Sequence, residues 1–97
     1  MYYADDVNSS YDRQSYNIIL KCRNKPNSKV KIYRAIPNNI PKDQQKINSG
    51  DWVSISKSYA IHHGEYIYDK DYVILSSTAY ANQLYNEGSI NEWSYIP

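Results

Sequence analysis

Four polar residues stand at positions where the sequence predicts β-strands, and their types suit chemistry on a phosphorylated substrate: Arg34, Ser54, Ser56 and Glu92. The guanidinium group of arginine is a rigid fork of donors that matches phosphate oxygens. A carboxylate such as that of Glu92 stabilises positive charge that develops during a reaction. Taken one at a time, each residue also has a structural interpretation, as a strand-edge arginine in water, as strand or cap serines, or as a solvated acid.

Other catalytic signatures are absent from the sequence. It has no glycine-rich phosphate loop, no dinucleotide-binding GxGxxG pattern, no paired-cysteine zinc spacing and no nucleophile elbow. His62 and His63 are adjacent, so on a helix their rings point about 100° apart and make a poor shared metal site. Cys22 lies among apolar residues of a predicted helix, where packing is the simpler role. We therefore expect no metal site and no thiol nucleophile.

The first half of the chain predicts a helix followed by a strand. Apolar spacing indicates the helix over residues 14–23, and Pro26 closes it off in a polar turn. Residues 30–36 alternate in the manner of a strand, which places Arg34 on the same face as Val30 and Ile32. An arginine on an otherwise apolar strand face is unusual, and this position makes Arg34 a candidate functional residue.

The second half predicts a second strand over residues 52–56 and a short helix over 57–63, with Ser56 as its N-cap and Gly64 at its end. The pattern then predicts a third strand over 72–75, a helical turn within 79–85 and a last strand over 89–96. The elements together predict a small α+β fold with one N-terminal helix and further short helices. We expect a single domain spanning residues 1–97.

Composition limits the possible partners. The chain of 97 residues has a formal net charge of +1, and its basic residues form no run, which disfavours non-specific nucleic-acid binding. No apolar segment approaches the roughly 20 residues that span a bilayer, and the start of the chain lacks the apolar stretch of a signal peptide. A single cysteine cannot form an internal disulfide. We therefore expect a cytoplasmic protein. The sequence also has twelve tyrosines, which indicate either a contact surface or the coding bias of an AT-rich genome.

A family resemblance rests on an ordered set of segments. These are residues 11–15 (YDRQS), 30–37 (VKIYRAIP), 47–60 (INSGDWVSISKSYA) and 90–93 (INEW). In order and spacing they resemble the small ADP-ribosyltransferase-like domains found in many phage and mobile-element proteins. The likeness covers most of the chain, and its specificity lies in the ordered set rather than in any one motif. It implies the split β-sheet core of that fold.

The resemblance also implies a role for each candidate residue. Arg34 corresponds to the arginine that holds the phosphate or ribose of NAD, and Ser54 with Ser56 corresponds to the Ser-x-Ser strand that supports the nicotinamide ribose. Glu92 corresponds to the catalytic glutamate that contacts ribose hydroxyls and stabilises an oxocarbenium-like transition state. Tyr59, in the helix after the Ser-x-Ser strand, is placed to stack on nicotinamide. NAD is then a substrate, consumed by cleavage of its nicotinamide–ribose bond.

Two functions follow from this resemblance. The first is a phage-type mono-ADP-ribosyltransferase that binds NAD and transfers ADP-ribose to a host target in the host cytoplasm. The second is an inactive protein on the same scaffold that inhibits a host defence factor by direct contact. Ile90 stands where arginine-modifying transferases commonly carry Glu or Gln, so the resemblance gives no support to arginine as the acceptor.

Overall fold

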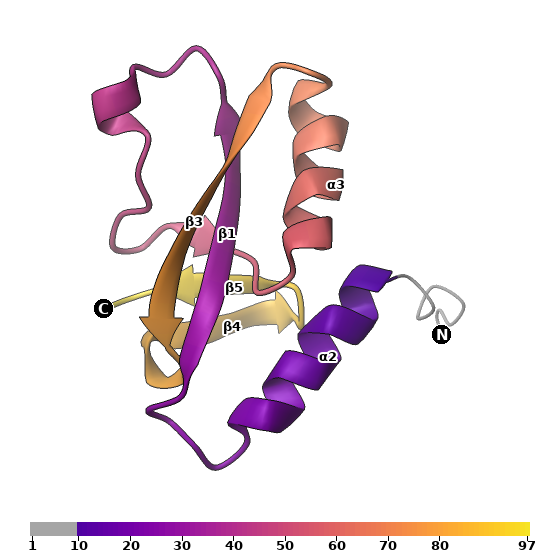
Figure 1. Ribbon diagram of the computed structural model, residues 1–97, viewed down its shortest axis with the longest axis vertical. Coiled ribbons are helices and arrows are strands. Elements are labelled where there is room, and N and C mark those ends of the chain that lie inside the picture. The colour runs from indigo at the N-terminus through magenta and orange to yellow at the C-terminus, as the bar shows by residue number, and fades with distance from the viewer. Residues whose placement is uncertain (1–9) are drawn as a thin grey trace.

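The computed structural model describes residues 10–97, which form two α-helices and two antiparallel β-sheets. The predicted α+β class is therefore confirmed (Figure 1). The elements follow in the order α2 (Ser10–Cys22), β1 (Lys29–Pro37), the 3₁₀-helix η1 (Lys42–Gln44), β2 (Trp52–Val53), α3 (Lys57–Tyr68), β3 (Tyr72–Tyr80), the 3₁₀-helix η2 (Ala81–Gln83), β4 (Leu84–Ser89) and β5 (Glu92–Tyr95).

The first sheet is the pair β1 and β3, which runs antiparallel along the whole length of both strands. Helix α3 packs against both strands and lies beside them in Figure 1. Gly64 makes this close packing possible, because a Cβ atom at this position would lie 2.6 Å from the ring of Tyr72 and 3.0 Å from the Cβ of Ala35. Helix and sheet are thus fitted together at a position that only glycine suits.

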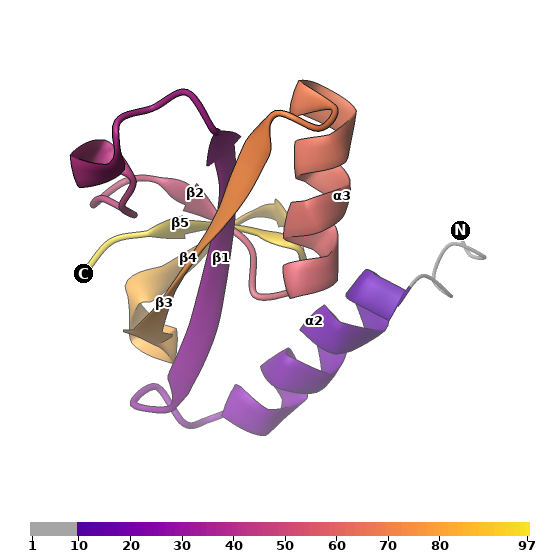
Figure 2. The same ribbon diagram turned by 45° about the horizontal axis from the view of Figure 1, so that its top comes forward.

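The second sheet has the strand order β2-β5-β4, and β4 and β5 run across the direction of β1 and β3 (Figures 1 and 2). A two-residue bridge joins the sheets. The Tyr33 N–H donates to the Ser54 carbonyl at 2.8 Å, and the Ser54 N–H donates to the Tyr33 carbonyl at 2.7 Å. The chain that leaves β2 is therefore held against the middle of β1.

The hydrophobic core lies between the two sheets. Val30 and Ile32 of β1 pack there with Val53 and Ile55, and partly buried side chains from α2, β4 and β5 cover this cluster. The predicted inward face of β1 is confirmed at Val30 and Ile32. Farther along the strand Ala35 is also buried, because α3 covers the other face of the sheet.

The structure corrects the predicted helix and strand around Ser56. The short helix expected over 57–63 continues to Tyr68, because Gly64 lies in its buried face and does not end it. Asp69, with φ of 59°, takes the C-cap position instead. The predicted strand over 52–56 pairs regularly only at Trp52–Val53, since Ser54 leaves the second sheet to bond with β1.

The boundaries near both ends of the chain also differ from the prediction. Helix α2 begins at Ser10 rather than at residue 14. Strand β3 extends to Tyr80, because it pairs with all of β1, and the expected helical turn is confined to Ala81–Gln83. The strand expected over 89–96 is confined to β5, which begins at Glu92 and ends at Tyr95, and residues 84–89 form β4, a strand that the sequence pattern does not predict.

Candidate functional site

Glu92 and Trp52 share one face of the second sheet. Trp52 is paired with Ser94 in the antiparallel register, and Glu92 lies two residues before Ser94 on the same strand. Because side chains along a strand alternate between faces, Trp52 and Glu92 point to the same side. The neighbouring Val53 and Trp93 point to the other side, where both pack in the hydrophobic core. The sheet thus separates an apolar face from a face that carries a carboxylate.

Tyr59 connects this face to α3. Its hydroxyl donates a hydrogen bond to Oε2 of Glu92, across 33 positions of sequence. The start of the helix is fixed at the same place, because the Ser56 side-chain oxygen caps it by accepting from the Tyr59 N–H at 3.1 Å. The orientation of the Glu92 carboxylate therefore depends on how α3 begins.

Three aromatic rings lie next to this hydrogen bond. The ring centroids of Trp52 and His63 are 4.7 Å apart, and the Tyr59 centroid lies 6.1 Å from Trp52 and 6.4 Å from His63. Tyr59 and His63 are four residues apart on α3, so they share one side of the helix. A surface hollow lined by Tyr59, His63 and the exposed Tyr66 opens beside them. Such a group of rings offers a stacking surface for a planar heterocycle.

Arg34 reaches the same region from β1. One of its Nη atoms donates to the Trp52 carbonyl at 2.7 Å, and its Nε lies 3.8 Å from a carboxylate oxygen of Asp51. The bond to the Trp52 carbonyl explains why an arginine occurs on the core-facing side of β1. Its guanidinium extends past the apolar cluster and reaches the backbone of β2. The side chain keeps 29% of its surface exposed. A guanidinium carries five N–H donors, so one hydrogen bond and one ion pair leave donors to hold an anion.

Ser54 and Ser56 lie beneath this surface. Both are fully buried. The Ser54 side-chain oxygen accepts from the Ser56 N–H at 3.0 Å, and the Ser56 hydroxyl donates to the Gln14 amide oxygen at 2.7 Å. These bonds fix the turn from β2 into α3 and tie it to α2. The geometry gives both serines a positioning role, while direct contact with a ribose stays a prediction.

The structure brings Glu92 and Tyr59 into direct contact. Arg34 bonds to the backbone carbonyl of Trp52, whose ring is a neighbour of Tyr59. Trp52 and His63 belong to this group, although the sequence had indicated Trp52 only as a strand residue and His63 only as a poor metal ligand. A signal for them existed in the spacing. Trp52 precedes Ser54 by two residues in the strand predicted over 52–56, and His63 follows Tyr59 by one helical turn.

The sequence predicts no metal site and no membrane-spanning segment, and two properties of the structure bear on these expectations. Within residues 10–97, no group of three or more His, Cys, Asp or Glu side chains is placed to hold a metal ion. His62 is exposed, whereas His63 lies in the aromatic group with its ring tilted by 31° against that of Trp52. In the same part of the chain, no helix combines the length and the apolar character needed to cross a bilayer.

Comparison of the chain with protein-family models, with curated proteins and with solved structures finds no match. The geometry of the site is therefore the ground on which a function can be argued.

Proposed function

We propose that this protein is a phage-type mono-ADP-ribosyltransferase that binds NAD and transfers ADP-ribose to a host target in the host cytoplasm. In this proposal Glu92 is the catalytic residue, and Arg34 and Tyr59 contact NAD. Ser54 and Ser56 hold the strand end and the helix start that carry these groups. The proposed scaffold is the split β-sheet core of the ADP-ribosyltransferase-like fold.

The observation that carries the proposal is the hydrogen bond between the Tyr59 hydroxyl and the Glu92 carboxylate beside the ring of Trp52. It places an oriented negative charge next to a surface on which a planar heterocycle can stack. A nicotinamide on those rings would set its ribose near Glu92. Cleavage of the glycosidic bond builds positive charge on that ribose, and a fixed carboxylate stabilises this charge in the transition state.

Arg34 supplies the complementary charge for the other part of the dinucleotide. Its hydrogen bond to the Trp52 carbonyl fixes the guanidinium at the backbone of β2, where its remaining donors suit a pyrophosphate. The Asp51 carboxylate forms an ion pair with the same guanidinium and partly neutralises its charge. Arg34 therefore binds an anion less strongly than an arginine without an acidic neighbour would.

Incubation of the purified protein with NAD labelled in its adenylate part, together with a bacterial lysate, tests the proposal. We expect label to move onto a discrete acceptor and nicotinamide to be released in step. Glu92→Gln protein serves as the matched control, because it changes one carboxylate to its neutral isostere. The absence of both labelled acceptor and free nicotinamide with wild-type protein, across lysates of several bacterial hosts, would contradict the proposal.

A second function is favoured by a separate observation. The candidate serines are fully buried, and α3 exposes large apolar side chains, with Tyr66 82% and Ile67 51% exposed. Both features suit an inactive scaffold that inhibits a host defence factor by contact. For such a protein, pull-down from a lysate should recover one stoichiometric partner. Tyr66→Ala should release that partner, while Glu92→Gln should leave both the complex and the inhibition intact.

A further inference from the structure

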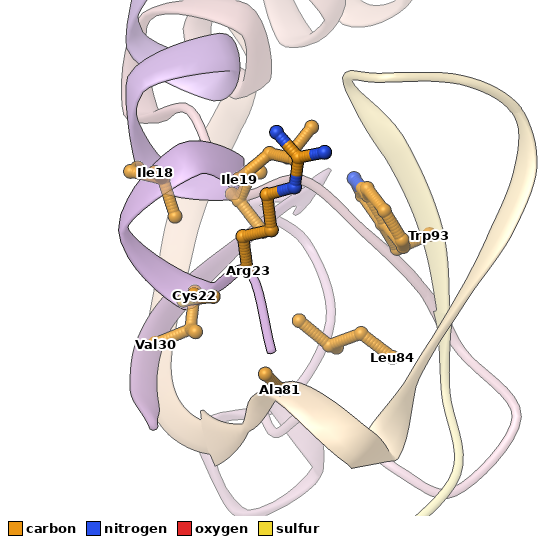
Figure 3. Close-up of a pocket in the computed structure, with 9 residues that line it drawn as sticks. Ile18, Ile19, Cys22, Arg23, Val30, Ala81, Leu84 and Trp93 are labelled. Atoms are coloured by element: carbon orange, nitrogen blue, oxygen red, sulfur yellow. The ribbon is translucent and has the colours of Figure 1, made fainter. Parts of the chain in front are cut away.

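An apolar pocket of about 200 Å³ opens on the core side of the second sheet. Its walls come from Ile18 and Cys22 of α2, Leu84 of β4 and Trp93 of β5, as Figure 3 shows. Trp93 is the neighbour of Glu92 on β5, so the two side chains point to opposite faces of the sheet. The pocket is therefore separate from the candidate site, and nothing in the proposed function uses it.

The size and lining of the pocket define the ligand that fits it. An engineered apolar cavity of about 150 Å³ in another protein stays dry and binds benzene, so a pocket of this size holds one ring or a short alkyl chain. The side chains around an empty apolar space lack dispersion contacts that a hydrocarbon would restore. A peptide segment is too large for this volume. The occupant that fits is a small molecule with a hydrocarbon body.

Arg23 is the charged residue of the lining. It follows the last residue of α2, and its side chain is exposed at the pocket edge. Figure 3 shows its guanidinium between the side chains of Ile19 and Trp93 in that view. A guanidinium beside an otherwise apolar pocket complements a ligand that ends in a carboxylate.

We propose that this pocket binds a small apolar carboxylate, with the hydrocarbon between α2 and the second sheet and the carboxylate on Arg23. The hydrocarbon contacts Ile18 and Leu84 and lies over the ring of Trp93. The charge of Arg23 distinguishes the acid from a neutral molecule of the same shape. This site rests on geometry alone and holds whether or not the protein cleaves NAD.

Cys22 provides a local reporter of occupancy. It lines the pocket, is half-buried, and is the one cysteine in the sequence. Its alkylation by iodoacetamide is therefore a single signal, which reports access to Cys22 from this pocket and from the adjoining hollow that it also lines with Lys29 and Tyr33. We compare protection by hexanoate with protection by 1-hexanol at matched ionic strength, in wild type, in Arg23→Gln and in Lys25→Gln. Lys25 is exposed two residues farther on and serves as the matched charge control.

Both probes are expected to slow alkylation of the wild type. For each probe we determine the concentration that halves the alkylation rate, and we divide the value for hexanol by the value for hexanoate. This ratio should fall about threefold in Arg23→Gln, because loss of the charge weakens binding of hexanoate only, and threefold is the scale of one exposed ion pair. The same ratio should be unchanged in Lys25→Gln. Alkylation of wild type that neither probe slows would overturn the pocket as a ligand site. An unchanged ratio in Arg23→Gln, with its circular dichroism spectrum matching that of wild type, would overturn the carboxylate assignment.

Discussion

At the scale of single residues, Glu92 and Tyr59 form the contact on which the proposed chemistry depends. The Tyr59 hydroxyl donates to one carboxylate oxygen. An ionised carboxylate offers two oxygens with about four lone-pair sites, so this bond orients Glu92 without exhausting its capacity to accept from a sugar hydroxyl. Tyr59 is therefore a positioning residue for Glu92 as well as one wall of the stacking surface.

Tyr59→Phe separates these two roles of Tyr59. The substitution keeps the ring beside Trp52 and removes the hydroxyl that orients Glu92. We expect kcat for nicotinamide release to fall about tenfold, which corresponds to roughly 1.4 kcal/mol, while KM for NAD changes little. Tyr66→Phe on the exposed side of α3 is the matched control and should behave as wild type. A raised KM with unchanged kcat would show that the hydroxyl serves binding and not the orientation of Glu92.

Arg34→Ala tests the proposed anion contact. It removes the guanidinium that bonds the Trp52 carbonyl, and NAD binding should weaken by roughly 1.5–3 kcal/mol, the scale of a charge-assisted hydrogen bond. Titration calorimetry measures this change directly. Lys31→Ala, an exposed cation on the same strand, controls for the loss of one positive charge. Equal NAD affinity in Arg34→Ala and wild type would remove Arg34 from the site.

At the scale of elements, Ser56 links the two helices. Its oxygen caps α3, and its hydroxyl donates to Gln14 of α2. Loss of an N-cap costs about 0.5–2 kcal/mol, and the substitution also removes the hydrogen bond from the buried Ser56 hydroxyl to Gln14, which contributes about 1 kcal/mol. We expect Ser56→Ala to lower the free energy of unfolding in urea by about 2 kcal/mol, with exposed Ser76→Ala as control. A change below about 0.5 kcal/mol would contradict the positioning role.

The local elements could be predicted from the sequence where short-range patterns decide them. Alternation located β1 and its inward face at Val30 and Ile32, and apolar spacing located most of α2. The length of α3 could not be predicted, because Gly64 resembles a helix end and its buried contact with Tyr72 lies in another element. A contact between α3 and a distant strand leaves no pattern in either segment.

The same limit applies to the candidate site. Residue types were enough to select Arg34, Ser54, Ser56 and Glu92, but their contacts depend on packing between elements. The Ser15 hydroxyl donates to the buried Asn91 side-chain oxygen at 2.6 Å, across 76 positions. That contact accompanies the turn between β4 and β5, which falls within the strand expected over 89–96. Partners of this kind appear only when the fold is known.

At the scale of the whole molecule, the fold is thin, with extents of 38 × 32 × 17 Å. A domain of this size has a small entropy of unfolding, so a given stabilisation by a ligand raises its Tm by more degrees than in a larger domain. NAD at ten times its dissociation constant adds about 1.4 kcal/mol to folding, which raises Tm by about 5–10 °C for a domain of this length. Thermal unfolding followed by circular dichroism measures the shift. Arg34→Ala should lose most of it at the same NAD concentration, and a wild-type Tm that saturating NAD leaves unchanged would contradict NAD binding.

Nicotinamide release from NAD by wild-type and Glu92→Gln proteins, each with NAD affinity measured in parallel, decides whether the carboxylate performs the proposed chemistry. The substitution preserves the shape of the side chain and removes the charge that stabilises the developing oxocarbenium ion. We expect release to slow by about 10²–10³-fold, or roughly 2.7–4 kcal/mol, by analogy with the loss of one preorganised electrostatic contact, while NAD affinity stays close to wild type. Equal rates of release in the two proteins would contradict a catalytic role for Glu92.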